Sequence, residues 1–280
     1  KEYLNVLDFI GNYEKAGKAP LLLSGGQSFS KKGSCEYQDL EYPDDCIVDF
    51  DMRLIDLFKE IDKKKLTLKM QVRQEYYRVK ELLDGKRPSR MDLFTYMDDE
   101  IYRICVSGSH AKENPFQHYL DFLYELGELS EDEQELYAGI GREFIQTIET
   151  TEMQKVYKMP ILYSFYNHGN IRLAVTDEEV LESWKEFFDT GTNWKDFPNV
   201  NTYEDYKKVT DKQHLSKAKR MPIRFLKASG KGFFVEKNGY ALALRDEIGD
   251  VVGNMAFGEQ MGDVLGYRSL EYYRRRYEKE

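Results

Sequence analysis

Residues 220–244 carry the strongest fold signal in the chain, RMPIRFLKASGKGFFVEKNGYALAL. This stretch begins with a short apolar helix and continues into two β-rich segments, 233–237 and 240–244. The Asn-Gly pair between these two segments, at 238–239, is typical of the type I′ turn of a β-hairpin. The stretch therefore predicts a helix followed by a β-ribbon.

The same order of elements occurs earlier in the chain. The tetrapeptide KMPI at 158–161 matches RMPI at 220–223. Each is followed by a short apolar helix, and the first continues into a turn and a strand at 171–175. This recurrence favours an internal duplication of one small helix-plus-ribbon unit, with the outline of a winged-helix module. Two unrelated helices, each beginning at a proline, are the alternative.

The region before these units, from Asp51 to Ile148, has a helical pattern of apolar residues. Within it, the segment 66–83 predicts a helix, and Phe94, Met97, Ile101 and Ile104 predict a further helical stripe. Helix starts are predicted where a Ser or Thr is followed three residues later by an acid: Ser89–Asp92, Ser130–Glu133 and Thr176–Glu179. At the C-terminal end, 259–279 predicts a helix in which Gly262 and Gly266 allow close packing on a neighbour.

The composition is that of a folded protein of the cytoplasm. The chain has 280 residues, of which 41% are hydrophobic and 14% aromatic, enough for a substantial core. Three cysteines are too few for a disulfide framework, which favours a reducing compartment. We expect no membrane partner, because no run approaches the roughly 20 apolar residues of a membrane span and the first residues do not resemble a signal peptide.

Charge is distributed unevenly along the chain. The formal net charge is −9, and residues 121–196 hold 17 acidic and 6 basic side chains. Residues 207–237 hold 10 basic and 2 acidic side chains, enough to attract phosphate locally. A solvated helix face is the alternative explanation. The candidate nucleic-acid-binding residues are Lys217, Lys219, Arg220, Arg224, Lys227, Lys231 and Lys237, with Phe233, Phe234 and Tyr240 interleaved.

Motifs for catalysis are weak. The sequence has no Gly-x-x-x-x-Gly-Lys-Ser/Thr phosphate loop, and its four His and three Cys lack the spacing of a metal site. One pattern, Asp44 followed by Asp62 and Lys64, loosely resembles the acids and lysine of a metal-dependent nuclease. We therefore predict no catalytic or metal-binding residue in this chain, with a nuclease as a third hypothesis.

Several segments resemble a known family. Residues 3–12 (YLNVLDFIGN) look like the last strand of the second RecA-like domain in bacterial superfamily 2 helicases, of the DEAD/DEAH-box or type III restriction Res-subunit-like kind. Four later segments resemble the C-terminal accessory region of these helicases: 47–58, 87–100, 150–162 and 176–188. The resemblance implies that ATP and Mg are cofactors of the parent helicase, bound by motor domains that precede Lys1, with no cofactor in this chain.

These observations together predict an α+β fold that is predominantly helical. The expected domains are the edge of a RecA-like domain at 1–30, a helical domain at 31–150, and two winged-helix-like units at 151–200 and 201–280. The expected function is a nucleic-acid-engaging accessory region of an ATP-dependent helicase, with DNA as the expected partner and no ATPase of its own. The alternative is a protein-interaction scaffold that docks the motor or another subunit.

Overall fold

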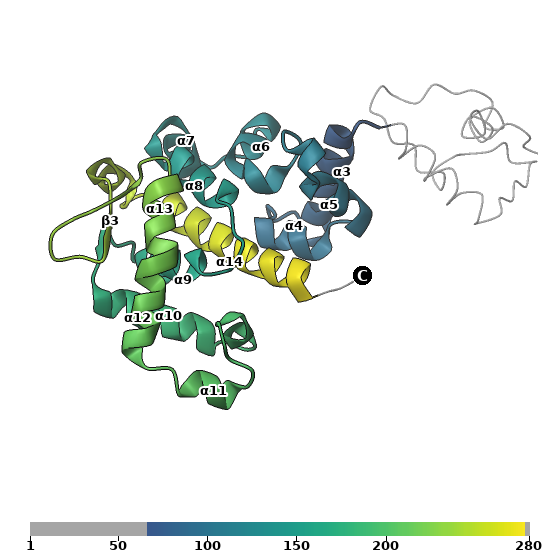
Figure 1. The fold of residues 1–280 in the computed structure, drawn as a ribbon. Helices are drawn as coiled ribbons and strands as arrows, with labels where there is room; N and C mark the ends of the chain where they lie inside the picture. Colours follow the sequence, from purple (N-terminus) through teal and green to yellow (C-terminus); the bar gives the residue numbers. More distant parts are fainter. Residues whose placement is uncertain (1–65, 278–280) are drawn as a thin grey trace, which may run out of the picture. The chain divides into compact units, whose positions relative to one another are not determined.

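The computed structural model describes residues 66–277 (Figure 1). The chain divides into two compact units, Lys1–Arg73 and Gln74–Glu280, and nearly all of the described residues belong to the second. The following sequence predictions lie outside the described residues: the RecA-like edge at 1–30 with its strand at 3–12, the first part of the helical pattern that begins at Asp51, and the nuclease-like residues Asp44, Asp62 and Lys64.

Helices dominate the first half of the described chain. They are α3 (Leu68–Leu82), α4 (Arg90–Tyr96), α5 (Asp99–Val106), α6 (Tyr119–Leu126), α7 (Glu131–Ala138) and α8 (Ile140–Thr150). Two short 3₁₀ turns, Gly108–His110 and Pro115–Gln117, connect α5 to α6. The predominantly helical character expected from the apolar periodicity is therefore confirmed.

The three predicted helix starts have complete capping boxes. Ser89, Ser130 and Thr176 each accept a hydrogen bond from the backbone N–H three residues later, and the acidic side chain at that position accepts one in return. A fourth box, Thr210 with Gln213, begins α12 (Asp211–Ala218). Each box satisfies two backbone donors that have no partner within the helix.

The predicted stripe from Phe94 to Ile104 is divided between two helices. α4 ends before Met97, whose backbone is extended, and Asp98 caps α5 by accepting hydrogen bonds from two backbone N–H groups. The turn between the helices changes their phase, so Met97 and Ile101 are buried while Ile104 is 36% exposed. The break comes from the Asp98 cap, a local feature that the apolar spacing does not reveal.

The second half combines helices with a small sheet. Its α-helices after α8 are α9 (Lys158–Tyr166), α10 (Asp177–Asp189), α11 (Tyr203–Lys207), α12, α13 (Arg224–Ser229) and α14 (Met255–Tyr277). The strands are β1 (Ala174–Val175), β2 (Phe234–Val235) and β3 (Leu242–Leu244). The remaining turns are 3₁₀ segments at Asn167–Gly169, Asn193–Asp196 and Asp246–Val251.

The sheet joins segments from the two ranges expected to form separate units. Its strand order is β1-β3-β2, and both pairs are antiparallel. Ala243 lies opposite Ala174 on one side and Val235 on the other, so the hairpin shares its central strand with the earlier segment. The domain boundaries at 150 and 200 stay predictions.

Helix α14 forms the centre of this unit (Figure 1). It packs against α4, α7, α8 and α9, and its residues Phe257, Met261, Val264 and Leu265 are fully buried. Gly262 lies where a Cβ atom would come within 2.5 Å of the Tyr166 hydroxyl oxygen. A glycine here therefore permits the close approach of α9, as its sequence position predicted.

A buried arginine links three of these helices. Arg90 of α4 has no exposed surface, and its guanidinium donates to the carboxylates of Glu149 on α8 at 2.5 Å and Asp263 on α14 at 2.8 Å. It also donates to the side-chain oxygen of Gln260 at 2.7 Å. Because a buried charge is tolerated only when it is paired and hydrogen-bonded, this network holds α4, α8 and α14 in one arrangement.

Candidate nucleic-acid interface

The candidate basic residues lie on one long helical segment and on the hairpin that follows it. α12 continues without a break through a π-helical turn, Lys219–Ile223, into α13 (Figure 1). The predicted short apolar helix after RMPI is present as α13, but Pro222 lies inside the continuous segment, so the alternative of a helix that begins at this proline is wrong. A proline lacks an N–H group and crowds the preceding turn, and the wider π turn accommodates it.

The segment has a buried face and an exposed basic face. His214, Ala218, Ile223 and Leu226 are buried. On the other side, basic side chains recur every three or four residues and are exposed or half-buried: Lys217, Arg220, Arg224 and Lys227. Residues spaced in this way lie on one face of a helix, so four of the seven candidates form a continuous row.

Two further candidates follow on the loops around the hairpin. Lys231 is exposed in the turn between α13 and β2, where its φ of 50° and that of Gly232 at 78° form a left-handed bend. Lys237 is exposed beside the hairpin turn, which is closed by a 3.1 Å hydrogen bond from the Tyr240 N–H to the Lys237 carbonyl.

The hairpin turn differs from the predicted type. Gly239 has a φ of 86°, whereas Asn238 does not have a positive φ, so the turn is not of the predicted I′ type.

We call Lys217, Lys219, Arg220, Arg224, Lys227, Lys231 and Lys237 the basic ridge. Two of its charges are partly neutralised: Lys219 pairs with Asp177 at 2.6 Å, and Lys227 pairs with Glu236. Within residues 66–277, Arg220 and Lys231 form no ion pair. Burial, followed by the smaller effect of the positive charges of Arg220 and Lys155, lowers the pKa of Lys217.

Exposed apolar side chains are interleaved with the ridge. Met221 is 38% exposed, Phe225 41% and Tyr240 45%. The Arg224 guanidinium lies 5.0 Å from the centre of the Phe225 ring, and the Lys237 ammonium lies 6.0 Å from that of Tyr240. These rings, held beside cations, could stack on unpaired bases.

The aromatic candidates divide between core and surface. Phe233 and Phe234 are buried and pack near the Phe144 ring, so only Tyr240 of the three interleaved aromatics is free to meet a ligand. Phe225 was missed by sequence reasoning, which placed it in an apolar helix. Its neighbour Leu226 is buried, and successive residues of a helix point about 100° apart. The adjacency of two large apolar residues on one helix is therefore the sequence signal that one of them could be exposed.

We also searched the described residues for metal ligands, reactive cysteines and membrane-spanning helices. No group of three or more His, Cys, Asp or Glu residues is placed to hold a metal ion there. Burial raises the pKa of the Cys105 thiol to about 12, so this cysteine stays protonated. No helix between residues 66 and 277 has the length and apolar content that a membrane crossing needs.

The chain matches no protein-family model, no curated protein and no solved structure. The resemblance to superfamily 2 helicases therefore stays a prediction from the sequence, and the function is argued below from the geometry of the ridge.

Proposed function

We propose that this chain engages nucleic acid, with DNA as the expected partner, through the basic ridge. The observation that carries the proposal is the row of Lys217, Arg220, Arg224 and Lys227, in which the arginines are exposed and the lysines half-buried, extended by the exposed Lys231 and Lys237. Cations in such a row neutralise successive phosphates and release their counterions, so the predicted binding is sensitive to salt and tolerant of sequence.

The exposed rings give the ridge a second mode of contact. Phe225 and Tyr240 lie beside the cations of Arg224 and Lys237, so bases of a single strand can stack on them while the cations contact the backbone. A duplex hides the faces of its bases, whereas its phosphates remain accessible. The proposal therefore includes a preference for single-stranded over duplex nucleic acid of equal length.

The place of this activity in a larger protein is also a proposal. On the sequence resemblance, the chain serves as the C-terminal accessory region of an ATP-dependent superfamily 2 helicase of the restriction or DNA-processing type. ATP and Mg would be bound by RecA-like motor domains, since this sequence has no phosphate loop. In this arrangement the ridge grips the strand that the motor moves.

Charge reversal on the ridge tests the proposal. Fluorescence anisotropy with labelled strands of about 20 nucleotides should show binding at about 50 mM salt, weakened about tenfold or more by Arg220→Glu, Arg224→Glu and Lys231→Glu together. The matched control for the single reversal Arg220→Glu is Lys112→Glu, an exposed lysine outside the ridge, which should leave the affinity nearly unchanged. No binding at low salt, or equal effects of Arg220→Glu and Lys112→Glu, would contradict the proposal.

Phe225→Ala separates the two modes of contact. Removing the exposed ring should weaken single-strand binding by about fivefold to a hundredfold, since stacking contributes about 1–3 kcal/mol per base, and should affect duplex binding much less. The control is Phe225→Trp, which keeps a stacking face. Capture of a protein partner by a chain without affinity for either form of DNA would favour the scaffold alternative.

A further inference from the structure

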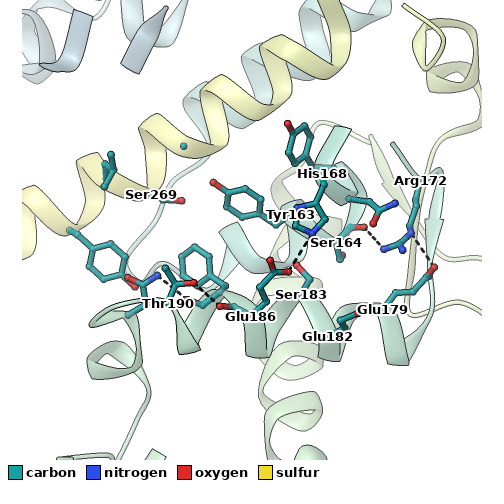
Figure 2. Close-up of a pocket in the computed structure, with 17 residues that line it drawn as sticks. Tyr163, Ser164, His168, Arg172, Glu179, Glu182, Ser183, Glu186, Thr190 and Ser269 are labelled. Atoms are coloured by element: carbon teal, nitrogen blue, oxygen red, sulfur yellow. Dashed lines mark hydrogen bonds and ion pairs between the residues drawn. The ribbon is translucent and has the colours of Figure 1, made fainter. Parts of the chain in front are cut away.

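A groove of about 550 Å³ lies among α9, α10 and α14 and uses none of the ridge residues. Helices α9 and α10 pack along each other, and α14 contributes Ser269, Leu270 and Tyr273 to the opposite wall. Figure 2 shows Tyr163 and His168 on one side, with Glu179, Glu182 and Glu186 following one another along α10. The groove therefore combines an aromatic wall with an acidic one.

The aromatic wall is built by α9 and its neighbours. The Tyr163 ring lies 6.2 Å from that of Tyr166 and 5.9 Å from that of Phe187, measured between ring centres. Leu270 is 47% exposed, although it lines the groove. The Tyr273 hydroxyl oxygen is buried without a hydrogen-bond partner among the described residues. The exposed part of this wall, with Leu270, thus offers apolar surface to a ligand.

The acidic wall offers two carboxylates. Glu179 is occupied, because it caps α10 and pairs with Arg172 at 3.1 Å. Among the described residues, the Glu186 carboxylate meets only the His168 ring, at 3.6 Å, and its side chain is 59% exposed. Glu182 forms no ion pair or side-chain hydrogen bond within the described part of the chain. Glu182 and Glu186 are four residues apart on a helix, so their Cβ atoms are about 6 Å from each other on one face.

The dimensions and charge of the groove select its ligand. Its lining on α10 extends from Glu179 to Phe187, which corresponds to about 12 Å of helix and to about four residues of extended peptide. The acids in the lining exceed its one arginine, so a nucleic acid backbone would be repelled and cations attracted.

We propose that this groove binds a basic peptide segment of a partner protein. Lys or Arg side chains of the segment would pair with Glu182 and Glu186, and its aliphatic parts would cover Tyr163 and Leu270. Arginine suits the site best, because its planar fork pairs with carboxylates bidentately and stacks on aromatic rings. This binding site is separate from the basic ridge and does not depend on the proposed nucleic-acid function.

Labelled peptides test the groove directly. The probe is a peptide of about seven residues in which Arg alternates with Leu, and the comparison peptide has Glu in place of Arg. We expect the basic peptide to bind the full chain, and Glu182→Gln with Glu186→Gln to weaken it about tenfold or more. Glu182→Gln alone should also weaken binding, and its matched control for general attraction by an acidic protein is Glu178→Gln, an exposed acid of the same helix outside the groove.

Three results would overturn this inference. The first is an equal effect of Glu178→Gln and the groove pair, and the second is equal binding of the acidic peptide. The third is a concentration-dependent dimer, seen by light scattering and abolished by the groove pair, which would assign the groove to a second copy of the chain.

DNA affinity should stay unchanged in the groove variants, so failure of the groove proposal and failure of the ridge proposal are distinguishable. Circular dichroism checks that each variant is folded.

Discussion

At the scale of single residues, His214 is the side chain whose burial has the clearest consequence. Its ring packs 5.0 Å from the Phe197 ring and 5.4 Å from the Tyr206 ring, and its Nδ1 has no hydrogen-bond partner among the described residues. Burial, followed by the nearby Lys185 charge, lowers the pKa of His214, against smaller opposite effects of Asp211 and Asp189. The folded protein therefore keeps this imidazole neutral.

This burial predicts a loss of stability in mild acid. The unfolded chain takes up a proton on His214 near pH 6.5, while the folded chain does not, so stability present above pH 6.5 is lost as the pH falls towards the lower folded pKa. Urea titrations between about pH 7.5 and 5 should show a slope from this residue of at most about 1.4 kcal/mol per pH unit.

His214→Phe should reduce the dependence of the free energy of unfolding on pH, whatever its effect on stability at neutral pH. His110→Gln is the control, since the His110 side chain is 42% exposed and should leave the slope unaltered. A His214→Phe variant with the same pH dependence as the parent would show that other groups cause the loss.

At the scale of elements, α14 provides a matched pair of glycines. A Cβ at Gly262 would meet the Tyr166 hydroxyl oxygen at 2.5 Å and the ring carbon that bears it at 2.8 Å, whereas one at Gly266 would meet only Met91 atoms, at 3.7 Å or more. Replacing either glycine by alanine improves the helix propensity by about 1 kcal/mol, but only Gly262→Ala also displaces an aromatic ring.

Gly266→Ala should therefore raise stability by up to about 1 kcal/mol, and Gly262→Ala should be less stable than Gly266→Ala by about 1–3 kcal/mol. Thermal unfolding followed by circular dichroism measures both. Equal stabilities of the two variants would mean that Tyr166 moves aside without cost.

The elements also show where sequence reasoning succeeds. Capping boxes such as Ser130–Glu133 are local, because both partners lie within one turn, and they were predicted correctly. The π turn around Pro222 was not predicted from the sequence. A proline inside a helix costs free energy, and here the burial of Ile223 and Leu226 in the core offsets that cost. Apolar spacing alone cannot weigh such tertiary packing against the usual behaviour of proline.

At the scale of the whole molecule, the predominantly helical α+β class followed from the apolar periodicity and the hairpin signal at 233–244, whereas the basic span at 207–237 followed from charge. The groove did not, because its walls come from α9, α10 and α14, whose residues lie up to about a hundred positions apart. Pairing of β1 with β3 was equally hidden, since short strands carry no sequence mark of their partner. Long-range juxtaposition is thus the part that required a structure.

The Arg90 network is the long-range contact most open to test. Arg90→Met should lower the free energy of unfolding by about 3–5 kcal/mol, since Glu149 would remain buried with an unpaired charge. Urea unfolding measures this loss, and the double variant Arg90→Met with Glu149→Met should recover part of it. Arg245→Met, which removes an exposed ion pair with Glu247, is the control and should change stability little. A loss for Arg90→Met as small as that of the control would contradict this role.

The salt dependence of DNA affinity tests the central claim most directly. If the ridge neutralises phosphates, the logarithm of the association constant should fall linearly with the logarithm of the salt concentration. Reversing Arg220, Arg224 and Lys231 should reduce that slope by about 2–3, the counterions of the lost contacts, while Lys112→Glu should preserve it. A slope that is the same in the parent and in the ridge variant would show that the nucleic acid, if bound, lies elsewhere on the protein.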